Sequence, residues 1–164
     1  DVSLVGSEMC IRDSYNTSEG HQKIAQAIQE MWKKHLGLNV VLTNVDWKVY
    51  LSRETQGDFD ISRAGWIGDY PDPFTFLDMM VTERGNNKTG WSNTAFDELL
   101  KQAASKISTE QRYDLYEEAE KILIDELPVI PLYTYTRTYL LSERVKNWQK
   151  NILDTNPYQF LSLE

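Results

Sequence analysis

Residues 38–66 read LNVVLTNVDWKVYLSRETQGDFDISRAGW. The Val- and Leu-rich opening predicts a strand over residues 38–45, and a short helix follows from about Trp47 to Gln56. Residues 59–66 predict a second strand. A strand, a helix and a strand in this order indicate a crossover connection between two parallel strands. This stretch therefore predicts an α/β fold.

Helical patterns flank this unit on both sides. Before it, the apolar residues between Ile24 and Trp32 fall on one helical face, after a cap at Ser18 and ahead of Gly37. Three further helices are predicted after it, over about residues 74–80, 94–105 and 108–126. Two later segments are strand-like, residues 129–135 and 138–141. We therefore expect one mixed sheet flanked by helices.

The composition limits the class of protein. Hydrophobic residues make up 41% of the 164 residues and charged residues 26%, which suits one ordinary domain with a buried core. No uninterrupted apolar run approaches the roughly 20 residues of a membrane helix. The 17 basic and 25 acidic residues give 17 − 25 = −8, so the chain lacks the basic surface that DNA or RNA binding requires. We expect no nucleic-acid partner.

The first 14 residues differ from the rest. They show no clear strand or helix period and no signal-peptide pattern. Their amino-acid sequence resembles the translated adapter sequence that contaminates some metagenome-derived reading frames. We predict a non-native or disordered leader over residues 1–14, with the native chain starting near Tyr15. A native loop or a piece of a strand is the alternative. The lone Cys10 lies in this leader and is discounted as a nucleophile.

Few enzyme signatures occur. The chain has no phosphate-binding glycine loop, no GxSxG and no HExxH. His21 and His35 lie at opposite ends of one predicted helix and could not share a metal without outside ligands. Asp69 and Asp72 could form a carboxylate pair for hydrolysis, but no nucleophile or second base accompanies them. We therefore predict no catalytic residue, no metal and no cofactor.

Residues 60–73 read DISRAGWIGDYPDP and carry the most informative chemistry. Ligands of α/β sheets gather at the carboxyl ends of strands. There Arg63 offers a fork for a carboxylate, Asp69 offers a partner for an ammonium group, and Trp66 offers a flat apolar wall. Such a pattern suits an extended zwitterionic ligand. On the pattern alone, however, purely structural roles are favoured, with Arg63 and Asp69 as members of structural ion pairs and Trp66 in the core.

Several motifs together carry a family resemblance. Each is weak alone, but their order over about Tyr15 to Tyr139 is specific. They are YNTS with His21 (15–21), WKK (32–34), GLNV (37–40), WKVY (47–50), FD with RAGW and DY (59–70), WSN with FD (91–97), and YEEAE leading to LPVIPLY (116–133). In this the chain resembles the C-terminal part of the extracellular solute-binding proteins of peptide ABC importers, the oligopeptide/dipeptide-binding family.

The resemblance implies an α/β, periplasmic-binding-protein-like (type II) fold of two lobes. Residues 15–144 would form the C-terminal lobe and residues 145–164 a C-terminal tail. It also implies seven ligand-binding residues: His21, Arg63, Gly65, Trp66, Ile67, Asp69 and Tyr70. Asp69 would hold the α-ammonium of a peptide, and Arg63 and His21 would meet its carboxylate. Trp66 would line a side-chain pocket, and residues 65–67 would pair with the peptide backbone.

The resemblance further implies the partners. A short peptide would be the ligand, bound without covalent change and delivered to ABC permease subunits in the membrane. The protein would be a monomer, periplasmic or anchored at the cell surface. Other cargoes remain open, namely nickel complexes, haem, oligosaccharides or opines, and so does a peptide-sensing role. Residues 86–90, NNKTG, form a predicted loop in which pocket selectivity could lie.

Overall fold

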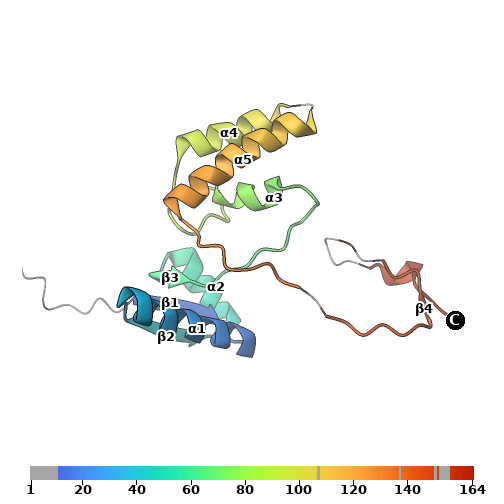
Figure 1. Cartoon of the computed structure of the whole chain (residues 1–164), viewed down its shortest axis with the longest axis horizontal. Coiled ribbons are helices and arrows are strands. Elements are labelled where there is room, and N and C mark those ends of the chain that lie inside the picture. The colour runs from blue at the N-terminus through green and yellow to red at the C-terminus, as the bar shows by residue number, and fades with distance from the viewer. Residues whose placement is uncertain (1–10, 107, 137, 150, 152–155) are drawn as a thin grey trace, which may run out of the picture. The chain divides into compact units, whose positions relative to one another are not determined.

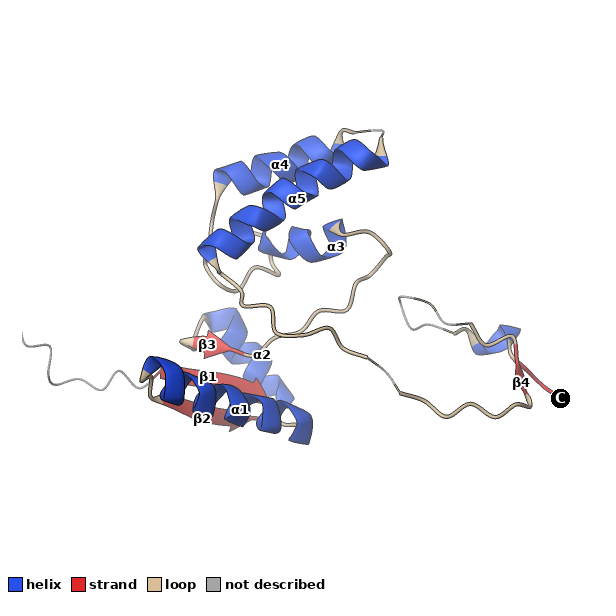
Figure 2. Ribbon diagram, in the orientation of Figure 1, coloured by secondary structure: helices blue, strands red, loops and turns tan. Residues whose placement is uncertain are grey.

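A computed structural model describes residues 11–106, 108–136, 138–149, 151 and 156–164. The chain forms two compact units, Asp1–Gly65 and Trp66–Glu164. Figure 1 follows both along the sequence, and Figure 2 distinguishes their helices from their strands. The first unit contains a small sheet with two helices, and the second contains a group of helices. The α/β class is confirmed.

The first unit is built on a parallel sheet of three strands in the order β2-β1-β3. The strands are β1 (Ile11–Asn16), β2 (Val40–Val45) and β3 (Ile61–Ser62). The helices between them are α1 (Glu19–Leu36) and α2 (Trp47–Gln56). The two connections run in opposite directions along the sheet, so right-handed crossovers place the helices on opposite faces. The two predicted strands are parallel, as expected, but they do not pair directly because β1 lies between them.

Local signals set the ends of both helices. The Asp46 carboxylate accepts hydrogen bonds from the backbone N–H groups of Lys48 and Val49, which caps the start of α2. Gly37 and Gly57 follow α1 and α2 with φ values of 67° and 69°. Glycine adopts this left-handed conformation without strain, and its N–H closes the last turn of each helix.

The central strand β1 overturns part of the leader prediction. Residues 11–14 belong to it, with Ser14 opposite Thr43 on one side and Ser62 on the other. The hydrogen bonds between strands are made by backbone groups whatever the side chains are. A strand can therefore form here although the polar side chains do not show a strand pattern. Asp13 and Ser14 are buried, although parallel strands covered on both faces are usually apolar. Residues 1–10, including Cys10, lie outside the described residues.

The second unit is organised around three helices and a 3₁₀ turn. These are α3 (Phe74–Leu77), η1 (Asp78–Met80), α4 (Thr94–Ala104) and α5 (Thr109–Glu126). Figure 2 shows α4 beside α5, with α3 packed against α5. Their shared core consists of Leu77, Met80, Phe96, Leu100, Ala103, Tyr116, Ala119 and Leu123. Asn93 caps α4 by accepting a hydrogen bond from the Phe96 N–H.

The end of the chain differs from the predicted single sheet. In the described part of residues 127–144 no strand forms, and apolar side chains such as Ile130 and Leu132 are exposed. A strand needs a neighbour for its backbone groups, and the described residues offer none here. Instead β4 (Val145–Lys146) pairs antiparallel with β5 (Ser162–Leu163), and η2 (Tyr158–Phe160) precedes β5.

Candidate functional site

The first group of predicted ligand residues lies at the carboxyl edge of the parallel sheet. Arg63 directly follows β3, and its N–H donates to the Ser14 carbonyl at 2.9 Å. His21, in the first turns of α1, places its Nδ1 atom 3.2 Å from the Asn16 carbonyl at the end of β1. Because β1 and β3 are parallel, both residues belong to the same edge, which is where α/β sheets bind ligands.

A buried hydroxyl fixes the backbone of Arg63. The Tyr50 Oη atom lies 2.7 Å from the Arg63 carbonyl and 2.6 Å from Glu54 Oε1. Ser62 Oγ donates to the same glutamate at 2.8 Å. Burial raises the pKa of Tyr50 well above its usual value, and the neighbouring Glu54 raises it further. Tyr50 therefore stays protonated and holds the end of β3 on α2.

The second group surrounds Asp69 in the loop before α3. Asp69, Asp72 and Asp78 lie within ten residues of each other, but only two of them have ionic partners. Asp72 pairs with Arg112, and Asp78 pairs with Arg84 at 3.0 Å. The Asp69 carboxylate is exposed and has no hydrogen-bond or ionic partner among the described residues. It is thus the aspartate of this loop that is available to a cationic ligand.

The position of Asp72 argues against a hydrolytic pair. One of its oxygens accepts a hydrogen bond from the Phe74 N–H at 3.0 Å, and the other meets Arg112. A carboxylate engaged at both oxygens is poorly suited to exchange protons with a substrate.

Three predicted residues within three positions of Asp69 in the sequence present exposed apolar surface. Trp66 is 37% exposed and stands outside the buried core of the second unit, so the alternative that placed it in the core is wrong. Ile67 and Tyr70 are exposed as well. The pKa of Tyr70 is raised, first by partial burial and then by the negative charge of Asp78. Aromatic and aliphatic surface beside a carboxylate can contact both parts of an amino-acid ligand.

The seven predicted residues divide between the two units. His21, Arg63 and Gly65 belong to the first, and Trp66, Ile67, Asp69 and Tyr70 belong to the second. His21 and Arg63 lie at the same edge of the sheet, and the second set lies within residues 66–70. Sequence reasoning missed Tyr50, Thr75 and Arg112, which hold these sets in place. No local motif marks them, because Arg112 lies 40 positions from its partner Asp72.

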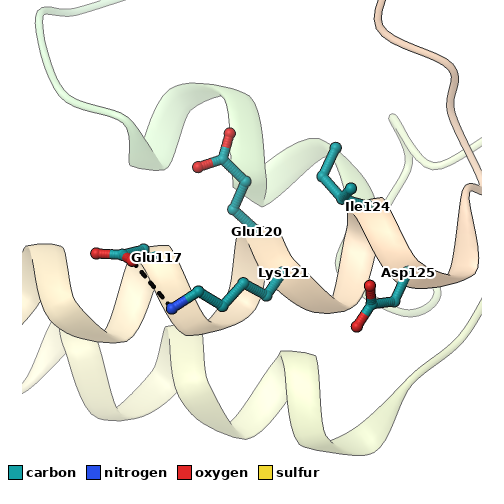
Figure 3. A pocket seen from close by; sticks show the side chains of 5 residues that line it. All are labelled: Glu117, Glu120, Lys121, Ile124 and Asp125. Atoms are coloured by element: carbon teal, nitrogen blue, oxygen red, sulfur yellow. Dashed lines mark ion pairs between the residues drawn. The ribbon is translucent and has the colours of Figure 1, made fainter.

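Two other features of the second unit lie outside the seven predicted residues. A shallow depression on the exposed side of α5 is lined by Glu117, Glu120, Lys121, Ile124 and Asp125 (Figure 3). Its Glu117–Lys121 ion pair of 2.9 Å follows ordinary helical spacing, and none of the predicted residues lies there. In the 86–90 loop, Asn87 donates to the Met80 and Trp91 carbonyls, so its side chain supports the loop.

Within the described ranges, no group of three His, Cys, Asp or Glu side chains is placed to hold a metal ion. None of the helices in that part of the chain has the length and apolar character needed to span a bilayer.

The first unit presents charged groups at a sheet edge, and the second presents an exposed carboxylate with apolar neighbours in sequence. Groups of these kinds suit the binding of a solute. Residues 9–88 match the bacterial extracellular solute-binding proteins, family 5 Middle. The oligopeptide-binding protein OppA of Bacillus subtilis is 47% identical over 137 residues, which cover 83% of this chain and 25% of that protein. The chain belongs to this family of extracellular solute-binding proteins.

Solved structures agree with this family. The murein tripeptide-binding protein MppA of Escherichia coli superposes with a TM-score of 0.82 at 37% identity, over 93% of this chain and 30% of that one. OppA of Haemophilus influenzae, in complex with RPPGFSPFR, gives 0.86 at 29% identity, over 96% and 32%. The periplasmic-binding-protein-like fold is confirmed. The chain spans about a quarter of the length of the curated relatives it matches.

Proposed function

We propose that this chain is part of a receptor that binds short peptides and delivers them to the permease of an ABC importer. The observation that carries the proposal is the exposed Asp69 carboxylate, whose two neighbouring aspartates already have arginine partners. Relatives named as oligopeptide- and murein-peptide-binding proteins supply the ligand class. In this role the receptor makes and breaks no covalent bond.

The proposed binding uses groups that every peptide shares. Asp69 accepts hydrogen bonds from the α-ammonium group, and Arg63 and His21 bind the carboxylate. Charge-assisted bonds of this kind are roughly twice as strong as neutral ones, and they do not depend on the peptide's sequence. Backbone groups of residues 65–67 pair with the peptide backbone by strand addition. Apolar surface at Trp66 accommodates varied side chains, which gives broad specificity together with affinity.

The proposal extends to Tyr70 and Ile67, which contribute apolar surface beside Asp69. It also covers location and assembly. The receptor works outside the cytoplasm, in a periplasm or anchored at the cell surface, as a monomer that docks onto permease subunits. The chain is the C-terminal lobe of the two-lobed receptor, residues 15–144, followed by the tail 145–164.

Asp69→Asn tests the function directly, because it removes the charge and keeps the shape. The chain replaces the matching segment of Bacillus subtilis OppA, which yields a full-length receptor, and calorimetry measures binding of a tripeptide and its N-acetylated form. We expect Asp69→Asn to weaken tripeptide binding by about a hundredfold, since an ammonium loses its charged partner. Glu117→Gln removes one exposed charge elsewhere and should change nothing. Equal tripeptide affinity in Asp69→Asn and the parent receptor would count against the proposal.

Other cargoes are tested separately. Native mass spectrometry of the full-length receptor, purified without added ligand, should detect co-purified short peptides. A nickel complex, a haem or an oligosaccharide in their place would show that the fold serves a different solute.

A further inference from the structure

An ion pair connects the loop that contains Asp69 to α5, a helix much later in the sequence. Arg112 lies in the first turn of α5, and its Nη2 atom contacts Asp72 Oδ2. The guanidinium carbon also lies 5.8 Å from the centre of the Tyr116 ring. Tyr116 belongs to the buried core of the second unit and packs beside the ring of Phe74. The guanidinium is therefore held between a fixed aromatic ring and a carboxylate.

Asp72 forms hydrogen bonds with the backbone on both sides of it, so the Arg112 contact holds both neighbouring segments. Its Oδ1 atom accepts a hydrogen bond from the Phe74 N–H, which starts α3. Its own N–H donates to the Tyr70 carbonyl at 2.9 Å, which closes the turn that follows Asp69. Fixing the Asp72 side chain thus fixes the backbone three residues after Asp69.

Asp69 is held from its other side by α3. Its N–H donates to Thr75 Oγ1 at 3.1 Å, and Thr75 is buried. At Gly68 an added Cβ atom would come within 3.0 Å of Thr75 Cγ2 and 3.1 Å of Phe76 Cζ. The loop therefore lies directly against α3, and the Asp69 side chain projects from a backbone that is anchored before and after it.

The same ion pair also makes Asp72 unavailable to a ligand, so that it does not compete with Asp69 for an ammonium group. Asp69 and Asp72 are three residues apart, and a free ammonium ligand could pair with either one. Arg112 neutralises Asp72, so the negative charge that remains for a ligand is on Asp69. The arrangement gives the cationic end of a ligand a single binding position.

We propose that Arg112 is a positioning residue for peptide binding, which acts through Asp72 to hold Asp69 where it meets the ligand's ammonium group. The inference rests on the proposed function above, since it assumes that Asp69 binds this group. Arg112 itself does not touch the peptide. Binding energy from a charged hydrogen bond depends on its geometry, so a loosened loop should weaken this one contact selectively.

The test uses the same full-length receptor and the same two peptides. Arg112→Met removes the charge but keeps a good helix former of similar length. Asp72→Asn removes the ion pair and retains an oxygen that can still accept from the Phe74 N–H. We expect each variant to weaken tripeptide binding by about tenfold and to change N-acetyl-tripeptide binding by less than about twofold. In an Asp69→Asn background, neither should cause a further loss.

Arg84→Met is the matched control, because Arg84 pairs with Asp78 outside the loop. It should leave binding of both peptides unchanged. Equal losses for both peptides in Arg112→Met, tripeptide affinity equal to the parent's, or the same loss in Arg84→Met would each overturn the positioning role. Should Arg112→Met fail to fold by circular dichroism, Asp72→Asn alone decides. If Asp69→Asn binds the tripeptide normally, the proposed function itself fails, which is a distinct result.

Discussion

The buried Asp13 should weaken the first unit increasingly as the pH rises. Asp13 is 5% exposed in the central strand, and its Oδ1 atom has no hydrogen-bond partner in the part of the chain that the structure describes. Burial disfavours the charged form and raises its pKa from 3.8 to about 6. Each pKa unit corresponds to about 1.4 kcal/mol, so the ionised form costs about 3 kcal/mol of unfolding free energy.

The sign of the pH effect follows from the raised pKa. Between pH 3.8 and about 6 the folded state binds more protons at Asp13 than the unfolded state does. The contribution of Asp13 to the free energy of unfolding therefore falls across this window and stays low above it. Below the unfolded pKa, both states are protonated and the cost disappears. Asp13→Asn, which has no charge to bury, should avoid the loss.

Amide hydrogen exchange measures this in the intact chain. At pH 7.5 we expect Asp13→Asn to raise protection of the β1 and β2 amides by about a hundredfold over the parent, and at pH 3.5 by less than about twofold. Amides of α4 and α5 belong to the other unit and serve as the internal control. Equal protection at pH 7.5, or a gain that persists at pH 3.5, would refute the reasoning.

Asp60→Asn provides a matched variant, because the contribution of Asp60 to stability has the opposite pH dependence. The Arg12 N–H donates to Asp60 at 2.8 Å and lowers the pKa of this carboxyl. Its stabilisation is present above the unfolded pKa and is lost as the pH falls through the lowered folded value. Asp60→Asn should therefore reduce protection of β1 at pH 7.5.

Two further substitutions test the supports of the candidate site. Tyr50→Phe removes the hydroxyl beside the Arg63 carbonyl and should cost about 1–2 kcal/mol in urea unfolding of the first unit; no loss would contradict a supporting role. Gly68→Ala crowds the buried Thr75 and should cost about 1–3 kcal/mol in thermal unfolding. Gly85→Ala, with open space around the added atom, should be nearly neutral, so equal effects of the two alanines would count against the predicted crowding.

The sequence alone determined the elements that depend on local signals. Trp47–Gln56 is the helix that was predicted, and α5 begins within a residue of its predicted start. Helices form hydrogen bonds within one segment, so their caps and apolar spacing are visible locally. In the described part of residues 129–141 the predicted strands did not form, and for residues 11–14 of β1 a strand was only the alternative prediction, because a strand depends on a neighbour that local sequence does not reveal.

The same distinction applies to the candidate site. Sequence marked Asp69, and resemblance gave it a role, but the chain alone could not separate it from Asp72 and Asp78, since all three are acidic residues in one polar stretch. Tertiary structure decided between them. Arg112 reaches Asp72 from 40 residues away, and Arg84 pairs with Asp78, so only the folded chain shows which carboxylate remains available. Electrostatic pairing acts through space, and that information is absent from any local pattern of residues.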